Sequence, residues 1–407
     1  MKETKNVPQL RFSGFDDEWE EKKLNEYLEP SKQKNLDNKY SKNDVLSVSG
    51  EFGIVNQIEF QGRSFAGEYV NNYGVVETND IVYTKSPLNA NPYGIIKSNF
   101  GKTGIVSTLY AVYKSKNNVD PCFIQTYFDL NKRLNDYLRP LVRKGAKNDM
   151  KVSSEDALLG NVVFPSKLEQ QKIGAFLSHV DSLIQAKIKK LESLKAVKKS
   201  LLQKCFPKEG EKVPEMRFAG FSGDWEEKKL GEIANIYDGT HQTPKYQSTG
   251  VKFLSVENIK NLETEKYIST ADFVKDFKLY PQKGDILMTR IGDIGTTNIY
   301  LSTEPIAFYV SLALLKPTNI DSLFLNYVIQ SPFVQNELSL HTLHTAIPKK
   351  INKNEISLVK LLVPSSKSEQ QKIGQFFSKY DSFISAQQKE IDKLKDIKKS
   401  LLQKMFV

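Results

Sequence analysis

The strongest constraint on the fold is a long internal repeat. The stretch 169–206, which begins EQQKIG and ends KKSLLQKCF, aligns without gaps to 369–406, with roughly 23 of 38 positions identical. A shorter repeat precedes each copy: PQLRFSGFDDEWEEKKL begins at Pro8 and PEMRFAGFSGDWEEKKL at Pro214. The blocks between these motifs, about 27–164 and 233–363, do not match each other. This pattern predicts shared scaffolding around two different working surfaces.

The long motif predicts an amphipathic helix in each copy. Apolar residues recur every three or four positions, with a lapse at Lys187 in the first copy and at Gln387 in the second. A helix of this length would extend roughly 57 Å, too long for the edge of one ordinary domain. We therefore expect the two helices to pair as an antiparallel coiled coil with approximate twofold symmetry, which would place the two blocks at opposite ends of a rod. The alternative is that each helix packs on the block before it. The apolar positions are Ile173, Leu177, Val180, Ile184, Leu191, Leu194 and Leu201, and then Ile373, Phe377, Tyr380, Ile384, Ile391, Leu394, Leu401 and Met405.

The variable blocks predict two α+β domains. Short runs rich in β-branched and aromatic residues, bounded by Gly, Asn, Asp and Pro, indicate strands in both blocks. The segment 324–338 is typical of a helix that breaks near Pro332. The expected strands lie in 45–50, 74–85, 94–98, 104–114, 251–259, 283–292, 306–317 and 359–364. The predicted order is a domain at 1–164, a long helix at 165–208, a domain at 209–363 and a long helix at 364–407.

The short repeated motif has two interpretations. We expect Phe12, Phe15 and Trp19 to form a local hydrophobic cluster that leads into a short strand or turn. The alternative is that the two copies dock a partner, since two equivalent copies would offer two equal surfaces.

Charge favours a polyanionic partner, whereas no motif indicates catalysis. The net charge is +10 and the pI is near 9.1, as in many nucleic-acid-binding proteins. The GKT at 101–103 lacks the earlier glycine of a P-loop, and the NPY at 91–93 lacks the second proline of the methyltransferase NPPY loop. The four histidines show no H-E-x-x-H pattern, so we expect no metal site. We expect no catalytic residues and no cofactor bound by this chain.

The sequence also indicates a cytoplasmic protein that does not enter a membrane. No run is apolar enough to span a bilayer, and the N-terminal MKETKNVPQ lacks the apolar core of a signal peptide. Cys122 and Cys205 form neither a disulfide framework nor a metal-ligand cluster, so we expect both to be reduced and structural.

Five turn-rich segments combine cations, amides, hydroxyls and aromatic rings, as DNA readers do. Arginine and lysine can pair with guanine edges or phosphates, and asparagine with adenine. The segments are 85–93, 142–149, 238–246, 289–295 and 344–350. The candidate DNA contacts are Lys85, Asn89, Asn91, Tyr93, Arg143, Lys144 and Lys147 in the first block, and Thr240, His241, Thr243, Lys245, Arg290, Asp293, Thr345 and Lys349 in the second.

The order of these parts resembles the specificity subunit of type I restriction-modification systems over essentially the whole chain. The resemblance is carried by the paired EQQKIG helix starts, the paired KKSLLQK ends and the paired WEEKKL segments. The segments DGTHQTP (238–244) and KGDILMTRIGDIG (283–295) are similar to those of many target recognition domains. KSPLNANPY (85–93) in the first block departs from the MTRIG form.

The resemblance implies a noncatalytic reader of double-stranded DNA. Each block would be a target recognition domain for one half of an interrupted bipartite target, and the paired helices would set the gap and dock two modification subunits. Those partners would carry S-adenosylmethionine and the adenine methyltransferase site, and restriction subunits with ATP- and Mg-dependent translocase and nuclease activity would then join. Two alternatives are a nuclease or methyltransferase with a degenerate site, and a coiled-coil scaffold that binds only proteins.

Overall fold

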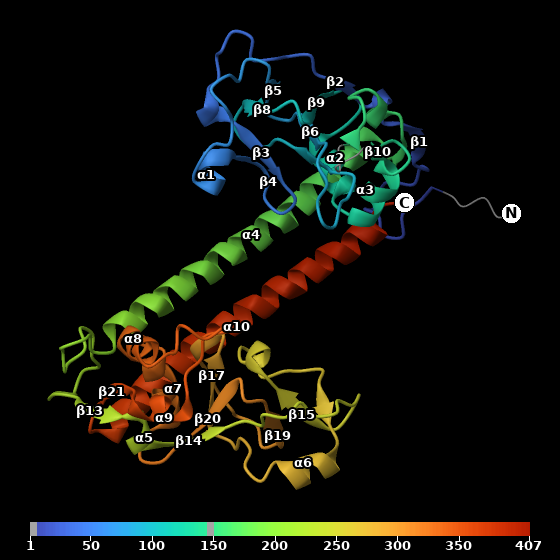
Figure 1. Ribbon diagram of the computed structural model, residues 1–407. Helices are drawn as coiled ribbons and strands as arrows, with labels where there is room; N and C mark the ends of the chain where they lie inside the picture. The colour runs from blue at the N-terminus through green and yellow to red at the C-terminus, as the bar shows by residue number, and fades with distance from the viewer. Residues whose placement is uncertain (1–5, 145–149) are drawn as a thin grey trace. The chain divides into compact units, whose positions relative to one another are not determined.

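The computed structural model describes residues 6–144 and 150–407 (Figure 1). The chain divides into two compact units, one formed by Met1–Ile188 with Lys389–Val407 and the other by Lys189–Gln388. This division runs through both long helices, α4 (Lys167–Lys204) and α10 (Lys367–Lys404). Each unit therefore contains one variable block, the N-terminal half of the helix that follows this block, and the C-terminal half of the other helix.

The first unit is built on a four-stranded antiparallel sheet of order β2-β9-β6-β7. Its strands are β2 (Leu28–Pro30), β9 (Tyr110–Ser115), β6 (Ile81–Thr84) and β7 (Ile95–Ser98). Four two-stranded sheets pair β1 (Glu20–Lys23) with β12 (Asn161–Phe164), β3 (Leu46–Ser49) with β4 (Gly53–Asn56), β5 (Gly74–Val76) with β8 (Gly104–Val106), and β10 (Arg143–Lys144) with β11 (Met150–Lys151). The shorter helices are α1 (Gln57–Gln61), α2 (Pro121–Phe128) and α3 (Asn131–Leu138).

The second unit is also built on a four-stranded antiparallel sheet, of order β14-β20-β17-β18. Its strands are β14 (Ala234–Asp238), β20 (Leu312–Pro317), β17 (Ile286–Ile291) and β18 (Asp293–Ile299). Two smaller sheets join β13 (Glu226–Lys229) to β21 (Lys360–Val363), and β15 (Val251–Leu254) to β16 (Tyr267–Ile268) and β19 (Ile306–Phe308). The shorter helices are α5 (Leu230–Ile233), α6 (Thr270–Asp276), α7 (Ser322–Ile329), α8 (Pro332–Leu340) and α9 (Lys353–Leu358). The expected break near Pro332 falls between α7 and α8.

The two blocks share a topology although their sequences do not align. In each unit, the first strand of the main sheet pairs with a late strand, which pairs with a middle strand, and a hairpin leads from there to the edge. Each unit also carries a pair of strands, β1 with β12 or β13 with β21, that joins the WEEKKL segment to the strand just before the long helix. The α+β fold class predicted from the sequence is confirmed.

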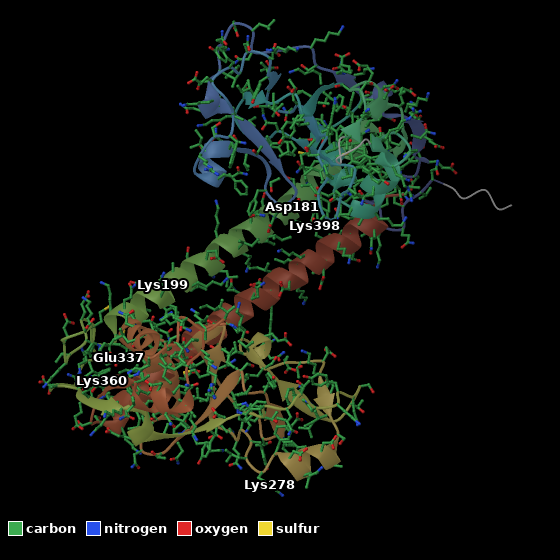
Figure 2. The ribbon with its side chains drawn as sticks, viewed as in Figure 1. Asp181, Lys199, Lys278, Glu337, Lys360 and Lys398 are labelled. Atoms are coloured by element: carbon green, nitrogen blue, oxygen red, sulfur yellow. The ribbon has the colours of Figure 1, made fainter. Side chains whose placement is uncertain are left out.

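The helices run antiparallel within each unit, as predicted. In the first unit, Lys187 Nζ of α4 donates to Glu390 Oε1 of α10 at 2.6 Å, and Lys398 Nζ of α10 donates to Asp181 Oδ2 of α4 at 2.9 Å. Figure 2 shows Asp181 and Lys398 on neighbouring helices. The residue number on α10 falls from 398 to 390 as that on α4 rises from 181 to 187, so the two helices run in opposite directions. The lapse at Lys187 therefore marks an ion pair between the helices.

The second unit repeats one of these contacts at equivalent positions. Lys198 Nζ of α4 donates to Asp381 Oδ1 of α10 at 2.6 Å. This pair is the counterpart of Lys398 with Asp181, because the two long motifs are offset by 200 residues. The approximate twofold repeat therefore extends from the sequence to the side-chain contacts.

The identical ends of the repeats complete equivalent hydrophobic cores. Phe406 lies edge-on to Trp19, with ring centroids 6.1 Å apart, and belongs to the core of the first unit. Phe206 packs in the same way on Trp225, also at 6.1 Å, in the core of the second unit. Each KKSLLQK segment thus ends in a core built mainly from the other variable block. This exchange gives the two ends a shared structural role.

The short motif leads into strands β1 and β13, but its aromatic rings do not form the expected local cluster. Phe12 packs edge-on against Phe176 of α4 at 5.7 Å, Lys172 of α4 lies over the ring of Phe15, and Trp19 is buried against Phe123. The long helix and α2 offer these rings larger apolar surfaces than the short motif itself provides, and burial favours those contacts.

The EQQKIG motif anchors the start of each long helix to its own block. Arg11 donates to both carboxylate oxygens of Glu169 at 2.7 and 2.8 Å, and Gln170 accepts a hydrogen bond from the backbone N–H of Asp120 at 3.0 Å. Gly174 lets α4 approach α2 closely, since an added Cβ would lie 2.8 Å from the backbone nitrogen of Phe123. The second copy repeats each contact with Arg217, Glu369, Gln370, Asp321, Gly374 and Phe324.

Candidate nucleic-acid interface

Three segments of the second unit meet at the end of strand β17. Arg290 donates from Nε to the carbonyl oxygen of Ile351 at 3.1 Å and from Nη1 to the carboxylate of Asp238, the last residue of β14. The backbone carbonyl of Arg290 accepts from the N–H of Ile351 at 3.0 Å, and the N–H of Gly292 donates to the carbonyl of Lys349 at 2.8 Å. These bonds hold the end of β14, the β17–β18 turn and the segment before α9 together.

Arg290 is a buried cation at the centre of this arrangement. It is 6% exposed, and burial lowers the pKa of its guanidinium from the ordinary arginine value. A buried charge is costly unless it is paired, and the carboxylate of Asp238 supplies the opposite charge. In this structure the side chain therefore positions the neighbouring loops. Sequence reasoning proposed a DNA contact for Arg290 and missed this bonding, because Asp238 and Ile351 lie far from it along the chain.

The other candidate residues of the second block surround this point. Asp293 is exposed as the first residue of β18 and accepts a hydrogen bond from Thr289 Oγ1 at 3.3 Å. Thr240 is half-buried, and its N–H donates to the carbonyl of Phe308 at 3.1 Å. The remaining candidates are exposed: His241, Thr243 and Lys245 follow Thr240, and Thr345 and Lys349 lie between α8 and α9. Backbone and side-chain bonds join Arg290 and Gly292 to the Lys349 segment, and Asp238 links the Thr240 segment to Arg290.

Lys85 occupies in the first unit the position that Arg290 occupies in the second. Thr84, at the end of β6, pairs with Tyr110 of β9, and Thr289 in β17 pairs with Leu312 of β20. Lys85 and Arg290 directly follow these threonines. The equivalence is visible in the sequence as DIVYTK at 80–85 and DILMTR at 285–290, a similarity that comparison with the MTRIG form alone overlooked.

The aspartates that begin these two segments are also held alike. Asp80 accepts from the N–H of Glu77 at 2.7 Å and from Lys114 Nζ at 2.8 Å. Asp285 accepts from the N–H of Gln282 at 2.9 Å and from Lys316 Nζ. The same turn and the same cross-strand lysine therefore support the strand that carries each candidate cation.

The candidate residues of the first block form a turn beside this strand. Lys85 is half-buried, and burial lowers the pKa of its ammonium group while nearby Glu155 opposes this shift. Asn89 is exposed, Asn91 is buried, and Tyr93 is half-buried with its carbonyl accepting from Tyr83 Oη at 2.7 Å.

The second candidate segment of the first block lies at the β10–β11 pair. Arg143 is exposed in β10 and faces Lys151 of β11 in the strand register. Lys144 also lies in β10. Lys147 lies outside the described residues.

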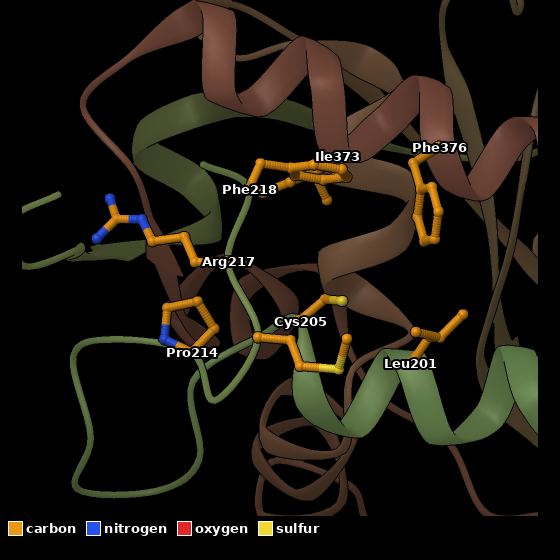
Figure 3. A pocket seen from close by; sticks show the side chains of 8 residues that line it. Leu201, Cys205, Pro214, Arg217, Phe218, Ile373 and Phe376 are labelled. Carbon is orange, nitrogen blue, oxygen red and sulfur yellow. The ribbon is translucent and has the colours of Figure 1, made fainter. Parts of the chain in front are cut away.

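An apolar pocket of about 230 Å³ lies in the second unit near the C-terminal end of α4 (Figure 3). The one charged side chain in its lining, Arg217, forms an ion pair with Glu369. The one nucleophilic group in the lining is the thiol of Cys205, and burial raises its pKa, which disfavours the reactive thiolate. It is lined by Leu201, Cys205, Pro214, Met216, Arg217, Phe218, Ile373 and Phe376.

The described residues contain neither a metal-binding cluster nor a membrane-spanning helix. Within 6–144 and 150–407, no three His, Cys, Asp or Glu side chains gather in a group that could hold a metal ion. In the same part of the chain, no helix combines the length and the apolar character needed to cross a bilayer.

The chain is similar in sequence to type I restriction specificity subunits. Residues 222–396 match the family model for the type I restriction modification DNA specificity domain. The specificity subunit of the type I restriction enzyme MjaVIII from Methanocaldococcus jannaschii is 25% identical over 348 residues, which cover 81% of this chain and 78% of that protein. The MjaIX specificity subunit of the same organism is 25% identical over 232 residues, 51% of this chain and 46% of that protein.

Solved structures show the same fold over nearly the whole chain. The S subunit of a type I restriction-modification system from M. genitalium superposes with a TM-score of 0.62 at 14% identity, covering 98% of this chain and 99% of that chain. A chain from a study of complex assembly and conformational transition of the type I R-M system gives a TM-score of 0.55 at 17% identity, with 97% and 99% coverage. The duplicated α+β fold with paired helices is that of an S subunit. Residues 222–396 thus match the DNA specificity domain of type I restriction modification systems, and the chain as a whole is similar to type I specificity subunits in sequence and in fold.

Proposed function

We propose that this chain reads an interrupted, bipartite sequence in double-stranded DNA, one half with each target recognition domain. The observation that carries this proposal is the equivalence of Lys85 and Arg290. Each cation comes directly after the threonine near the end of the corresponding strand, β6 or β17, beside exposed polar side chains from neighbouring loops. Cations and amides at strand ends and turns can contact phosphates and base edges. The unlike sequences around them suit two different half-sites.

The chain is noncatalytic in this proposal and acts within a larger complex. Two modification subunits dock on the repeated helical regions and supply S-adenosylmethionine and adenine methylation. Restriction subunits join through them and supply the ATP- and Mg-dependent translocase and nuclease. The twofold repeat of the helix contacts, seen in Lys198 with Asp381 and Lys398 with Asp181, supports two equivalent docking positions. The paired helices set the number of base pairs between the half-sites.

Methylation mapping tests this function directly. A host genome is mapped with this chain and a cognate modification subunit, and again with the modification subunit alone. We expect a new bipartite adenine motif only when the chain is present. A stable complex that adds no motif would favour a protein-binding scaffold, and methylation or metal-dependent cleavage by the purified chain alone would favour a degenerate enzyme.

The equivalence of Lys85 and Arg290 gives a matched pair of variants. We expect Arg290→Met to weaken binding of the mapped target by at least about tenfold, or about 1.4 kcal/mol, because the loops of the second domain lose their central anchor. The variant should also cease to distinguish the target from duplexes altered in the half-site that the second domain reads. Lys85→Met should cease to distinguish the target from duplexes altered in the half-site that the first domain reads. Binding is measured with duplexes altered in each half, and an equal loss for both halves in either variant would contradict the assignment.

A further inference from the structure

The segment between α8 and α9 forms a loop that is fixed at both ends. The N–H of Leu343 donates to the carbonyl of Lys350 at 2.8 Å, and the N–H of Lys350 donates back to the carbonyl of Leu343 at 3.4 Å. The bonds from Gly292 to Lys349 and between Arg290 and Ile351 tie the closed end to the β17–β18 turn. A loop held in this way loses little conformational freedom when it binds, so its tip is presented in a defined position.

The tip of this loop is apolar and fully exposed. Ile347 has no surface of its own unit to cover it, and Leu343, where the loop closes, and Leu340, the last residue of α8, are also exposed. Single exposed apolar residues are ordinary on protein surfaces. Two on the anchored loop and one just before it, with a branched aliphatic side chain at the tip, form an apolar surface of defined shape.

Charge around the tip favours DNA as the surface that covers it. Lys349 and Lys350 directly follow the Ile347–Pro348 pair, and both are exposed. The loop is continuous with the Arg290 arrangement that we assign to DNA reading. Two cations beside the tip can bind phosphates and hold the loop in a groove.

The chemistry of Ile347 then selects one feature of DNA. An aliphatic side chain neither donates nor accepts a hydrogen bond, so it cannot read the polar edge of a base. The C5-methyl group of thymine is the apolar group that base pairs present in the major groove. Contact between two apolar groups that both leave water is favourable.

We propose that Ile347 is a specificity-determining residue that contacts a thymine methyl group in the half-site read by the second domain, while Lys349 binds an adjacent phosphate. This proposal rests on the proposed function and deepens it by naming one base that the second domain reads. It adds an apolar contact to the polar contacts expected from the sequence.

Uracil substitution tests the contact with single-methyl resolution. The complex of the full chain with its modification subunits is bound to duplexes of the mapped target in which each thymine in turn is replaced by deoxyuridine. We expect wild-type affinity to fall about fourfold at one thymine of the second half-site, the value of one buried methyl group. The Ile347→Ala complex should bind the thymine duplex at least as weakly as the wild-type complex binds the uracil duplex. Replacing that thymine by deoxyuridine should then weaken Ile347→Ala no further. Since Ile347 is fully exposed, this substitution leaves the folded core intact.

Leu301→Ala is the matched control. Leu301 is exposed in the same unit, on the connection between β18 and β19, and this variant should keep the wild-type sensitivity to uracil. A second half-site without thymine, a wild-type complex insensitive to uracil there, or an Ile347→Ala complex as sensitive as wild type would overturn the contact. A DNA bend that Ile347→Ala abolishes without any uracil effect would instead indicate an intercalated wedge, which also overturns it.

The same binding measurements distinguish a failure of the thymine contact from a failure of the proposed function. If the wild-type complex does not distinguish the mapped target from a scrambled duplex, sequence reading itself fails. If it distinguishes them but shows none of the Ile347 effects, only the thymine contact fails.

Discussion

Replacing Arg217 by alanine should lower the free energy of unfolding by about 3–5 kcal/mol, because the change leaves a carboxylate buried without its cation. The carboxylate is that of Glu369, which is 1% exposed and accepts from Arg217 Nε at 2.7 Å and from Nη2 at 2.9 Å. The same guanidinium donates to the carbonyls of Ser222 and Gly223, so its loss also frees the turn of the short motif.

The two tryptophans make this measurement specific to one unit. Trp225 is buried in the core of the second unit and Trp19 in that of the first. Denaturant unfolding followed by fluorescence in a Trp19→Phe background therefore reports the second unit, where the Arg217→Ala effect should appear.

Two further variants separate the buried pair from a general effect of losing an arginine. Arg139 pairs with Asp136 on the surface, where both side chains are largely exposed, so Arg139→Ala should cost at most about 1 kcal/mol. Replacing both partners, as in Arg217→Met with Glu369→Leu, should restore most of the lost stability because no buried charge remains. If Arg217→Ala proved no worse than Arg139→Ala, the ion pair would not anchor the helix start.

The long helices and their pairing could be predicted because the sequence contains the same amphipathic pattern twice. The spacing of Ile173, Leu177 and Ile184 gives an apolar stripe, and a duplicated stripe of this length needs a partner. The α+β class followed from short strand patterns, which depend on local composition. These features are local or periodic, so a single sequence carries them.

The features of the fold and of the candidate interface that could not be predicted depend on contacts between residues far apart in the chain. The pair Arg11 and Glu169 spans 158 positions, and Lys398 reaches Asp129 across 269. Periodicity does not report such pairs. The shared topology of the two blocks was also hidden, because a sheet fixes strand order through backbone bonds and leaves most side chains free to differ. Within the candidate interface, exposed loops were located by composition, but the burial of Arg290 came only from its partners.

Replacing Asp129 by alanine should also cause a large loss of stability, in this case in the first unit. Asp129 is the C-cap residue of α2, is 7% exposed at its side chain, and accepts from Lys97 Nζ at 2.5 Å and from Lys398 Nζ at 2.7 Å. Asp129→Ala leaves two partly buried lysines facing the emptied position, and we expect a loss of about 3–5 kcal/mol in the stability of the first unit. Unfolding followed by Trp19 fluorescence in a Trp225→Phe background measures it.

The second unit supplies the matched control. Gln330 is the C-cap residue of α7, as Asp129 is of α2, but its Nε2 donates to Thr297 Oγ1 at 3.1 Å and its Oε1 accepts from Lys198 at a longer 3.5 Å. Gln330→Ala removes an uncharged amide, with one neutral hydrogen bond and one long bond from a lysine, and should cost about 1 kcal/mol, measured through Trp225. Equal costs at the two positions would show that the lysines around Asp129 contribute nothing beyond ordinary hydrogen bonding.

The effect of Asp129 should depend on pH with a definite sign. Burial raises the pKa of this carboxyl group, but attraction to Lys97 and Lys398, together with their hydrogen bonds, outweighs burial and leaves the pKa below its usual value. A carboxyl group with a lowered pKa stabilises the fold above its unfolded pKa and loses that contribution as pH falls through its folded pKa. The stability difference between wild type and Asp129→Ala should therefore be full at neutral pH and shrink in acid below the ordinary aspartate pKa. A difference that stayed constant across that range would mean that the packing of Asp129, and not its charge, joins α2 to the end of α10.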